Sequence, residues 1–170
     1  MELNQFLVGA KTNTYAAENA TERILEDGAH ELVYENGIFR YRDRYYGFNP
    51  FIGEELVWEN GKLVWAMNYF GGIYPEVVDL VGSKEIYSFL KLALQQVQED
   101  KPFRGPALFK NGNFTYNNEA RGTVNTFSGF ERIIWRGEVS EKLPGSRPLY
   151  ACAYHGGTMA EKGLITLWQI

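Results

Sequence analysis

The chain has 170 residues, one cysteine and a formal net charge of −4, and aromatic residues make up 15% of it. Cys152 alone cannot form an internal disulfide, the N-terminus lacks a secretory pattern, and no apolar run approaches the roughly 20 residues of a membrane span. Charges of both signs are scattered, with no basic block that could follow phosphates. We therefore expect a cytoplasmic protein that contacts neither membranes nor nucleic acid directly.

The first 30 residues contain one clear pattern. Four apolar residues at helical spacing predict a short amphipathic helix over residues 3–13: Leu3, Phe6, Leu7 and Ala10. The stretch from Tyr15 to Ala29 has no period, so we expect a loop there, with one helical turn at Thr21 to Leu25.

Three Asn-Gly pairs follow, at Asn36-Gly37, Asn60-Gly61 and Asn111-Gly112, each between runs of Val, Leu, Phe, Tyr or Trp. Asn and Gly tolerate positive φ at the two central positions of a type I′ turn, whose twist matches the flanking strands. Each pair therefore predicts a β-hairpin, and together they predict an antiparallel sheet.

A second helix lies between the hairpins. Ser83 can cap its N-terminus, and Asp100 and Pro102 can end it. Its apolar stripe is formed by Ile86, Phe89, Leu90, Ala93, Leu94 and Val97. Strands resume at Ala107, a surface loop is expected over residues 140–148, and one further strand is expected at Leu164 to Trp168.

The two halves of the sequence share motifs. The pattern F-x-G-x-E-x5-G begins at Phe51 and again at Phe127, and Y-x-G-G-x3-E begins at Tyr69 and again at Tyr154. Similar hairpins can produce some matches by chance, but self-similarity over this length favours a duplication. We predict an α+β domain spanning 1–170, made of two diverged helix-plus-four-strand repeats, approximately 1–82 and 83–170, about a pseudo-twofold axis, each with a cystatin-like helix-grip topology.

The repeat also indicates where chemistry could lie. Glu55 and Glu131 occupy equivalent places, so a pseudo-twofold could bring two carboxylates to one cleft, where each would alter the pKa of the other. The alternative is that each glutamate is structural and accepts bonds from backbone N–H groups or from an arginine. The Gly-Gly pairs fit either a chain reversal or close backbone packing, since neither leads into a phosphate-binding helix.

Three other positions are candidates. His155 replaces Phe70 of the first copy, and a histidine there could be a general base or an ordinary packed residue. Arg104, before a Gly-Pro turn, could anchor an anionic group. The cluster Arg40, Arg42, Asp43 and Arg44 is interpreted as a solvated strand face. No residue spacing predicts a metal site or a cofactor.

Several motifs resemble an uncharacterised bacterial and archaeal domain family, whose members are free-standing or form the C-terminal part of helix-turn-helix regulators of the Cro/CI class. The similar segments, within residues 3–157, are Tyr41–Asp43, Phe51–Glu55, Trp65–Gly72, Phe103–Pro106 and Tyr154–Gly157. The resemblance implies no established activity. The segment 140–148 and the C-terminal strand depart from the pattern, and no DNA-binding domain fits before Leu3, so a regulatory role would act through a partner.

Three functions remain open. The first, which we favour, is a binding or sensing module whose cleft between the repeats, walled by Trp65, Tyr69 and Tyr154, takes a small molecule or peptide. The second is a hydrolase or isomerase that uses Glu55 or Glu131 with His155 and Arg104. The third is a protein-interaction domain, such as a homodimer, that presents an aromatic face.

Overall fold

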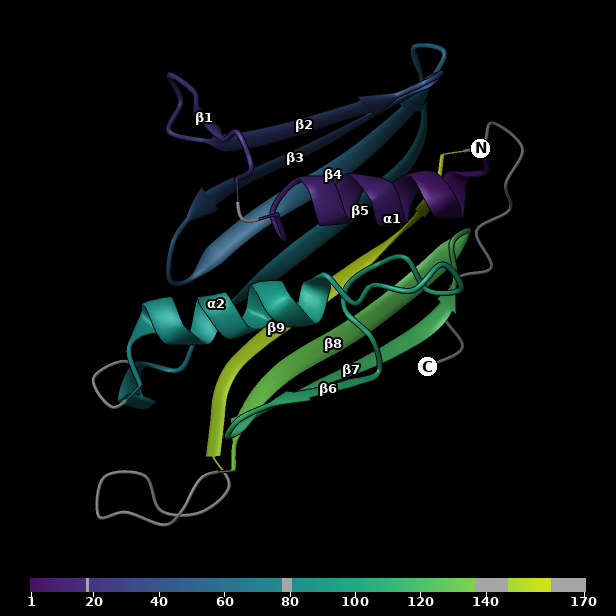
Figure 1. Ribbon diagram of the computed structural model, residues 1–170. Coiled ribbons are helices and arrows are strands. Elements are labelled where there is room, and N and C mark those ends of the chain that lie inside the picture. Colours follow the sequence, from purple (N-terminus) through teal and green to yellow (C-terminus); the bar gives the residue numbers. More distant parts are fainter. Residues whose placement is uncertain (18, 78–80, 137–146, 160–170) are drawn as a thin grey trace.

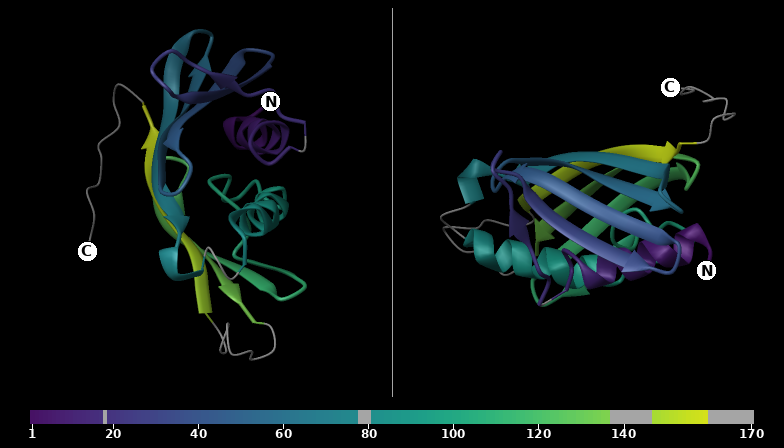
Figure 2. Two further views of the ribbon diagram at one scale, coloured as in Figure 1. Left: turned by 90° about the vertical axis from the view of Figure 1, so that its left-hand side faces the viewer. Right: turned by 90° about the horizontal axis from the view of Figure 1, so that it is seen from above.

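Nine strands form one antiparallel sheet in the residues described by the computed structural model, which are 1–17, 19–77, 81–136 and 147–159. Both α-helices of this part of the chain lie on one face of the sheet, which curves around them (Figures 1 and 2). The fold is therefore α+β. The elements are α1 (Leu3–Asn13), β1 (Arg23–Ile24), β2 (His30–Asn36), β3 (Phe39–Gly47), β4 (Phe51–Glu59), β5 (Lys62–Ile73), α2 (Ser83–Leu94), β6 (Leu108–Asn111), β7 (Phe114–Thr123), β8 (Thr126–Trp135) and β9 (Arg147–Thr158), with a 3₁₀ turn at Pro75–Val77.

The strands are ordered β1-β2-β3-β4-β5-β9-β8-β7-β6 across the sheet. The chain thus builds a meander from one edge to β5, crosses to the opposite edge through α2, and returns to the centre as β9 (Figure 1). At the centre, β5 pairs with β9, and Tyr69 lies directly opposite Tyr154.

All three predicted hairpins are present. Asn60 and Gly61, with φ of 47° and 79°, are the two central residues of the β4–β5 turn, as a type I′ turn requires. In the other two hairpins Asn36 pairs with Phe39 and Asn111 pairs with Phe114, so the asparagine belongs to the strand and the loop begins at the glycine.

Several local predictions need correction or lie outside the described residues. Helix α2 ends at Leu94, before the predicted stop at Asp100 and Pro102. Residues 23–24 form the short strand β1 where we predicted a helical turn, and Gly82, without a side-chain bond, precedes α2, so Ser83 is its first residue rather than its cap. Residues 147–148 of the predicted loop belong to β9. The rest of that loop from 140 to 146, the predicted strand at 164–168, Gly137 and Glu161 lie outside the described residues.

The two Gly-Gly pairs lie inside β5 and β9, so they do not reverse the chain. A Cβ at Gly71 would come within 2.6 Å of the Cβ of Cys152, and one at Gly156 within 2.2 Å of the carbonyl oxygen of Ala66. Close approach of the two central strands explains Gly71 and Gly156, whereas Gly72 is opposed by Asn49 and Gly157 by the carbonyl oxygen of Asn125.

The core lies between the concave face of the sheet and the helices. On β5, Trp65, Met67 and Tyr69 are buried on this face, whereas Asn68 and Phe70 alternate to the convex face and are exposed. The helices contribute Phe6, Leu7, Ile86 and Leu90 to the same core. The buried side chains of both helices and of β5 therefore meet on the concave side.

Candidate functional site

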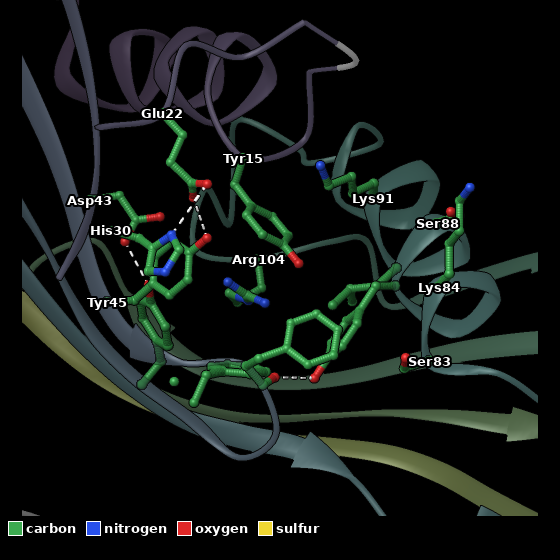
Figure 3. A pocket seen from close by; sticks show the side chains of 16 residues that line it. Tyr15, Glu22, His30, Asp43, Tyr45, Ser83, Lys84, Ser88, Lys91 and Arg104 are labelled. Atoms are coloured by element: carbon green, nitrogen blue, oxygen red, sulfur yellow. Dashed lines mark hydrogen bonds and ion pairs between the residues drawn. The ribbon is translucent and has the colours of Figure 1, made fainter. Parts of the chain in front are cut away.

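A cavity of about 440 Å³ separates α2 from the first half of the sheet (Figure 3). Its volume lies within the range of about 300–1,000 Å³ that is usual for small-molecule sites. The sheet, α2, and the segments that follow each helix all contribute to its lining: Tyr15, Glu22, His30, Asp43, Tyr45, Gly47, Phe48, Phe51, Tyr69, Ser83, Lys84, Tyr87, Ser88, Leu90, Lys91 and Arg104.

The helix side of the cavity follows from the spacing of α2. Lys84 and Ser88 are four residues apart, as are Tyr87 and Lys91, so these side chains share one side of the helix (Figure 3). Tyr87 donates a hydrogen bond of 2.7 Å to the backbone carbonyl of Phe48, and their rings meet edge to face at 5.1 Å. This contact joins α2 to the β3–β4 turn and closes one end of the cavity.

Asp43 lies at the floor of the cavity. It shares the inward parity of β3 with Phe39, Tyr41 and Tyr45, and it is only 4% exposed. The hydroxyl of Tyr69 donates a 2.6 Å hydrogen bond to its Oδ1. Burial, together with the neighbouring carboxylate of Glu55, raises the pKa of Asp43 to about 7.

Two ion pairs flank Asp43. Lys11, from the last turn of α1, pairs with Glu55, which lies opposite Asp43 in the β3–β4 register. Burial lowers the pKa of Lys11, and Glu55 opposes that shift. Wherever its proton lies, the Lys11–Glu55 pair has no net charge.

Arg104 and Glu131 form the second pair. Nη2 and Nε of Arg104 donate to Oε1 of Glu131 at 2.7 and 3.2 Å. Glu131 is fully buried and also accepts from the hydroxyls of Tyr116 and Tyr150. With this many donors Glu131 is a satisfied, structural carboxylate, and this pair also has no net charge.

The polar residues around the two glutamates match between the halves of the sheet. Asp43 lies opposite Glu55 and bonds to Tyr69, and in the same way Asn118 lies opposite Glu131 and accepts a 2.7 Å bond from Tyr154. Asn118 differs from Asp43 in donating too, from Nδ2 to the carbonyl oxygen of Gly105 at 2.8 Å. At this matched position one half carries a neutral amide and the other an acid that faces the cavity.

The glycine of each F-x-G-x-E motif lies directly beneath the tyrosine of the Y-x-G-G motif in the same half, where a larger residue would clash with the tyrosine. Gly53 lies opposite Tyr69, and a Cβ at Gly53 would come within 2.4 Å of the Tyr69 hydroxyl oxygen. Gly129 lies opposite Tyr154, and its Cβ would come within 2.1 Å of the Tyr154 ring. The two motifs are therefore two sides of one contact.

The structure brings together only some of the residues that the sequence singled out. Tyr69 and Arg104 line the cavity, and Glu55 lies with Arg104 and Asp43 at a smaller space of about 20 Å³ beside it. Trp65, Glu131 and Tyr154 are buried in the core, so Trp65 and Tyr154 do not wall the cavity as predicted.

His155 is exposed on the convex face, because it alternates with Tyr154 on β9. Glu55, Glu131 and Arg104 are buried on the other side. The predicted combination of His155 with either glutamate is thus not assembled in this structure.

Most residues of the cavity are not predictable from the sequence. The interpretation of Asp43 as part of a solvated face with its arginine neighbours is wrong, because the period of two places it with Tyr41 and Tyr45. Tyr15, Glu22, His30 and the α2 residues carry no local signal, since only the tertiary fold brings them together.

Across the described ranges, no cluster of three or more His, Cys, Asp or Glu side chains could hold a metal ion. Within the same part of the chain, no helix has the length and apolar character needed to cross a bilayer.

A model of one protein family matches residues 43–159, which is more than half of the chain. Its description is "Domain of unknown function (DUF5680)", and the chain belongs to this family. The matched region begins at Asp43 and includes Glu55, Tyr69, Arg104 and Glu131. No curated protein and no solved structure matches the chain.

Proposed function

We propose that the protein binds a small molecule in the cavity between α2 and β2–β5. The observation that carries this proposal is a cavity of about 440 Å³ with aromatic walls and one buried carboxyl group at its floor. Such sites combine an apolar lining, which supplies affinity, with a few polar groups, which fix orientation.

The aromatic walls favour a ligand with a flat or apolar body. Six tyrosine and phenylalanine rings line the cavity, and the four tyrosines also carry a hydroxyl group. The six residues are Tyr15, Tyr45, Phe48, Phe51, Tyr69 and Tyr87. Tyr45 is stacked on His30 with ring centres 4.9 Å apart, and Phe51 lies edge to face with Tyr69 at 6.0 Å, so these wall residues are already packed against one another. A preformed wall lowers the entropic cost of binding.

Filling the cavity tests this proposal. Ser88 is exposed on α2 and lines the cavity, so Ser88→Trp should block it without disturbing the core. Leu92→Trp is the matched control, because Leu92 is also exposed on α2 but does not line the cavity. In a thermal-shift screen of metabolites, hits should stabilise the wild type and Leu92→Trp but not Ser88→Trp, and a ligand at 100 times its Kd should add about 2.7 kcal/mol. Hits that stabilise all three proteins equally would refute the proposal.

A proton-transfer enzyme is the second candidate, and the pKa of Asp43, raised to about 7, favours it. A carboxyl with a pKa near neutrality is suited to act as a general acid or base. The test is turnover of any ligand found in the screen: conversion by the wild type but not by Asp43→Asn would support catalysis, whereas recovery of unchanged ligand would support binding alone.

We further propose that the chain is two copies of a helix-plus-four-strand unit, each of the cystatin-like helix-grip kind. The mirrored strand order, the Tyr69–Tyr154 pair at the centre and the matched polar residues support this. A sensing role beside Cro/CI-type regulators, a cytoplasmic location and a homodimer remain predictions from the sequence. Expression of residues 1–82 and 83–170 as separate chains would test the duplication, because two copies of one unit should reassociate through β5 and β9.

A further inference from the structure

The charged groups around the cavity floor do not balance. Lys11 offsets Glu55, and Arg104 offsets Glu131, so both pairs are neutral. Asp43 is the fifth ionisable group of this cluster, and no cation among the described residues forms an ion pair with it. When Asp43 ionises, the floor carries one uncompensated negative charge in a buried setting, which is unfavourable unless a counter-charge is supplied.

The ionisable groups that face Asp43 from the packed elements supply no further cation. They are Lys11 from α1, Tyr15 after it, Tyr41 and Tyr45 from β3, Glu55 from β4, Tyr69 from β5 and Arg104 after α2. Tyr69 hydrogen-bonds to Oδ1 of Asp43 but brings no charge.

The cations at the rim do not reach the floor. Lys84 is exposed on α2, and the ammonium of Lys91 lies 5.1 Å from the centre of the Tyr15 ring. On the sheet side of the rim stand Glu22 and His30, with Nδ1 of His30 3.3 Å from Oε2 of Glu22 (Figure 3). Glu22 also accepts a hydrogen bond from Tyr45, so this side of the entrance adds a second carboxylate.

The other half of the sheet shows that the fold does not require an acid at this position. Asn118 occupies the matched place, accepts the bond from Tyr154, and carries no charge. The carboxyl of Asp43 therefore supplies something that an amide would not, and its location at the cavity floor indicates that this is charge toward the cavity.

We propose that the natural ligand is an organic cation, in which a protonated amine pairs with Asp43 while its apolar or aromatic body packs against the tyrosine and phenylalanine walls. This rests on the proposed binding function and specifies the ligand class. Aromatic faces also attract cations, so Tyr69 and Tyr45 favour the same ligand.

Three probes that share one apolar body test the ligand class: 2-(1-naphthyl)ethylamine, 2-(1-naphthyl)ethanol and 1-naphthylacetate, which are cationic, neutral and anionic at pH 8. Their Kd values are measured calorimetrically for the wild type, Asp43→Asn, Ser88→Trp and Leu92→Trp. We expect the amine to bind the wild type at least tenfold more tightly than the alcohol, and this preference to vanish in Asp43→Asn. Because an amide occupies the matched position in the other half, Asp43→Asn is expected to fold, which circular dichroism checks.

The outcomes separate the ligand class from the binding function. Equal affinity for the amine and the alcohol, blocked by Ser88→Trp, would overturn the cation proposal and leave the binding site in place. Tightest binding of the naphthylacetate would also overturn it, in favour of Arg104 and Lys91 as anion ligands. Absence of binding by all three probes would overturn both proposals. Repeating the titrations at pH 5.5 should weaken amine binding to the wild type about tenfold, since Asp43, with a pKa of about 7, is then mostly protonated. A loss of the same size in Asp43→Asn would contradict the proposal.

Discussion

The hydroxyl of Tyr69 on β5 donates a hydrogen bond of 2.6 Å to Oδ1 of Asp43 on β3, across the intervening strand β4. Burial, followed by the charge of Asp43, raises the pKa of Tyr69, so this hydroxyl keeps its proton and remains a donor. The bond holds the carboxyl group at the cavity floor. It also stabilises the ionised form of Asp43, but desolvation is the larger effect, and the pKa of Asp43 ends at about 7.

The raised pKa makes Asp43 a pH-dependent cost to stability. An acid whose pKa is higher in the folded than in the unfolded state binds more protons when folded, so the free energy of unfolding falls as pH rises from about 4 to about 7 and stays lower above it. Asp43→Asn removes this cost. We expect the variant to be more stable than the wild type by roughly 2–4 kcal/mol at pH 8, with a difference that shrinks toward pH 4.

Urea denaturation at several pH values measures this difference. Asp27→Asn is a suitable control, because Asp27 is exposed and its pKa is lowered by hydrogen bonds, first from the backbone of Ala29 and then from Tyr46, so its pH dependence has the opposite sign. A destabilised Asp43→Asn variant at pH 8 would show that Asp43 is compensated by a charge that the structure does not reveal.

The reverse exchange, Asn118→Asp, should be destabilising. Nδ2 of Asn118 donates to the carbonyl oxygen of Gly105 at 2.8 Å, and a carboxylate would place two acceptors against each other beside the buried Glu131. We expect a loss of about 1–3 kcal/mol at pH 8. The loss should lessen at low pH, where the introduced carboxyl can hold a proton and donate it, and thermal unfolding at pH 5 and pH 8 measures both values.

Much of the fold was predictable from the sequence because its signals are local. The Asn-Gly pairs and the alternation of apolar residues each depend on a few neighbouring positions, and the hairpins and helices they predict are present. The motif pairs, which favour a duplication, also coincide with real contacts, but these contacts of a glycine beneath each tyrosine depend on the register between strands and were not predicted.

The site was less predictable, because its parts come from distant segments. Tyr15, Asp43 and Arg104 come together only because the tertiary fold places the segments that follow α1 and α2 beside β3, and no local pattern encodes that placement. Asp43 was within reach of the sequence: its position, two residues from both Tyr41 and Tyr45, already put it on the buried face. The neighbouring arginines favour the interpretation of this segment as a solvated face, which is wrong for Asp43.

The Lys11–Glu55 pair provides a test of the charge balance. Lys11→Met leaves the carboxyl of Glu55 buried and uncompensated beside Asp43, and such a loss typically costs about 3–5 kcal/mol. The double variant Lys11→Met/Glu55→Gln removes both charges, so it should recover a large part of that cost. A complete double-mutant cycle by urea denaturation gives the coupling energy, and strictly additive losses would contradict a paired, neutral site.

The contact between Gly129 and Tyr154 provides the sharpest test of the packing. Gly129→Ala would place a Cβ 2.1 Å from the ring of Tyr154, whose hydroxyl is held by Asn118 and cannot easily move aside. Overpacking of this kind typically costs about 1–3 kcal/mol. Gly9→Ala is the control, because a Cβ at Gly9 would meet Tyr34 at an ordinary 3.5 Å and alanine favours the α1 helix, so this change should be neutral or stabilising by about 0.5–1 kcal/mol. Tyr154→Leu should relieve the clash, so Gly129→Ala should cost less in the Tyr154→Leu background than in the wild type; an unchanged cost in chemical denaturation would mean that the tyrosine is not what requires the glycine.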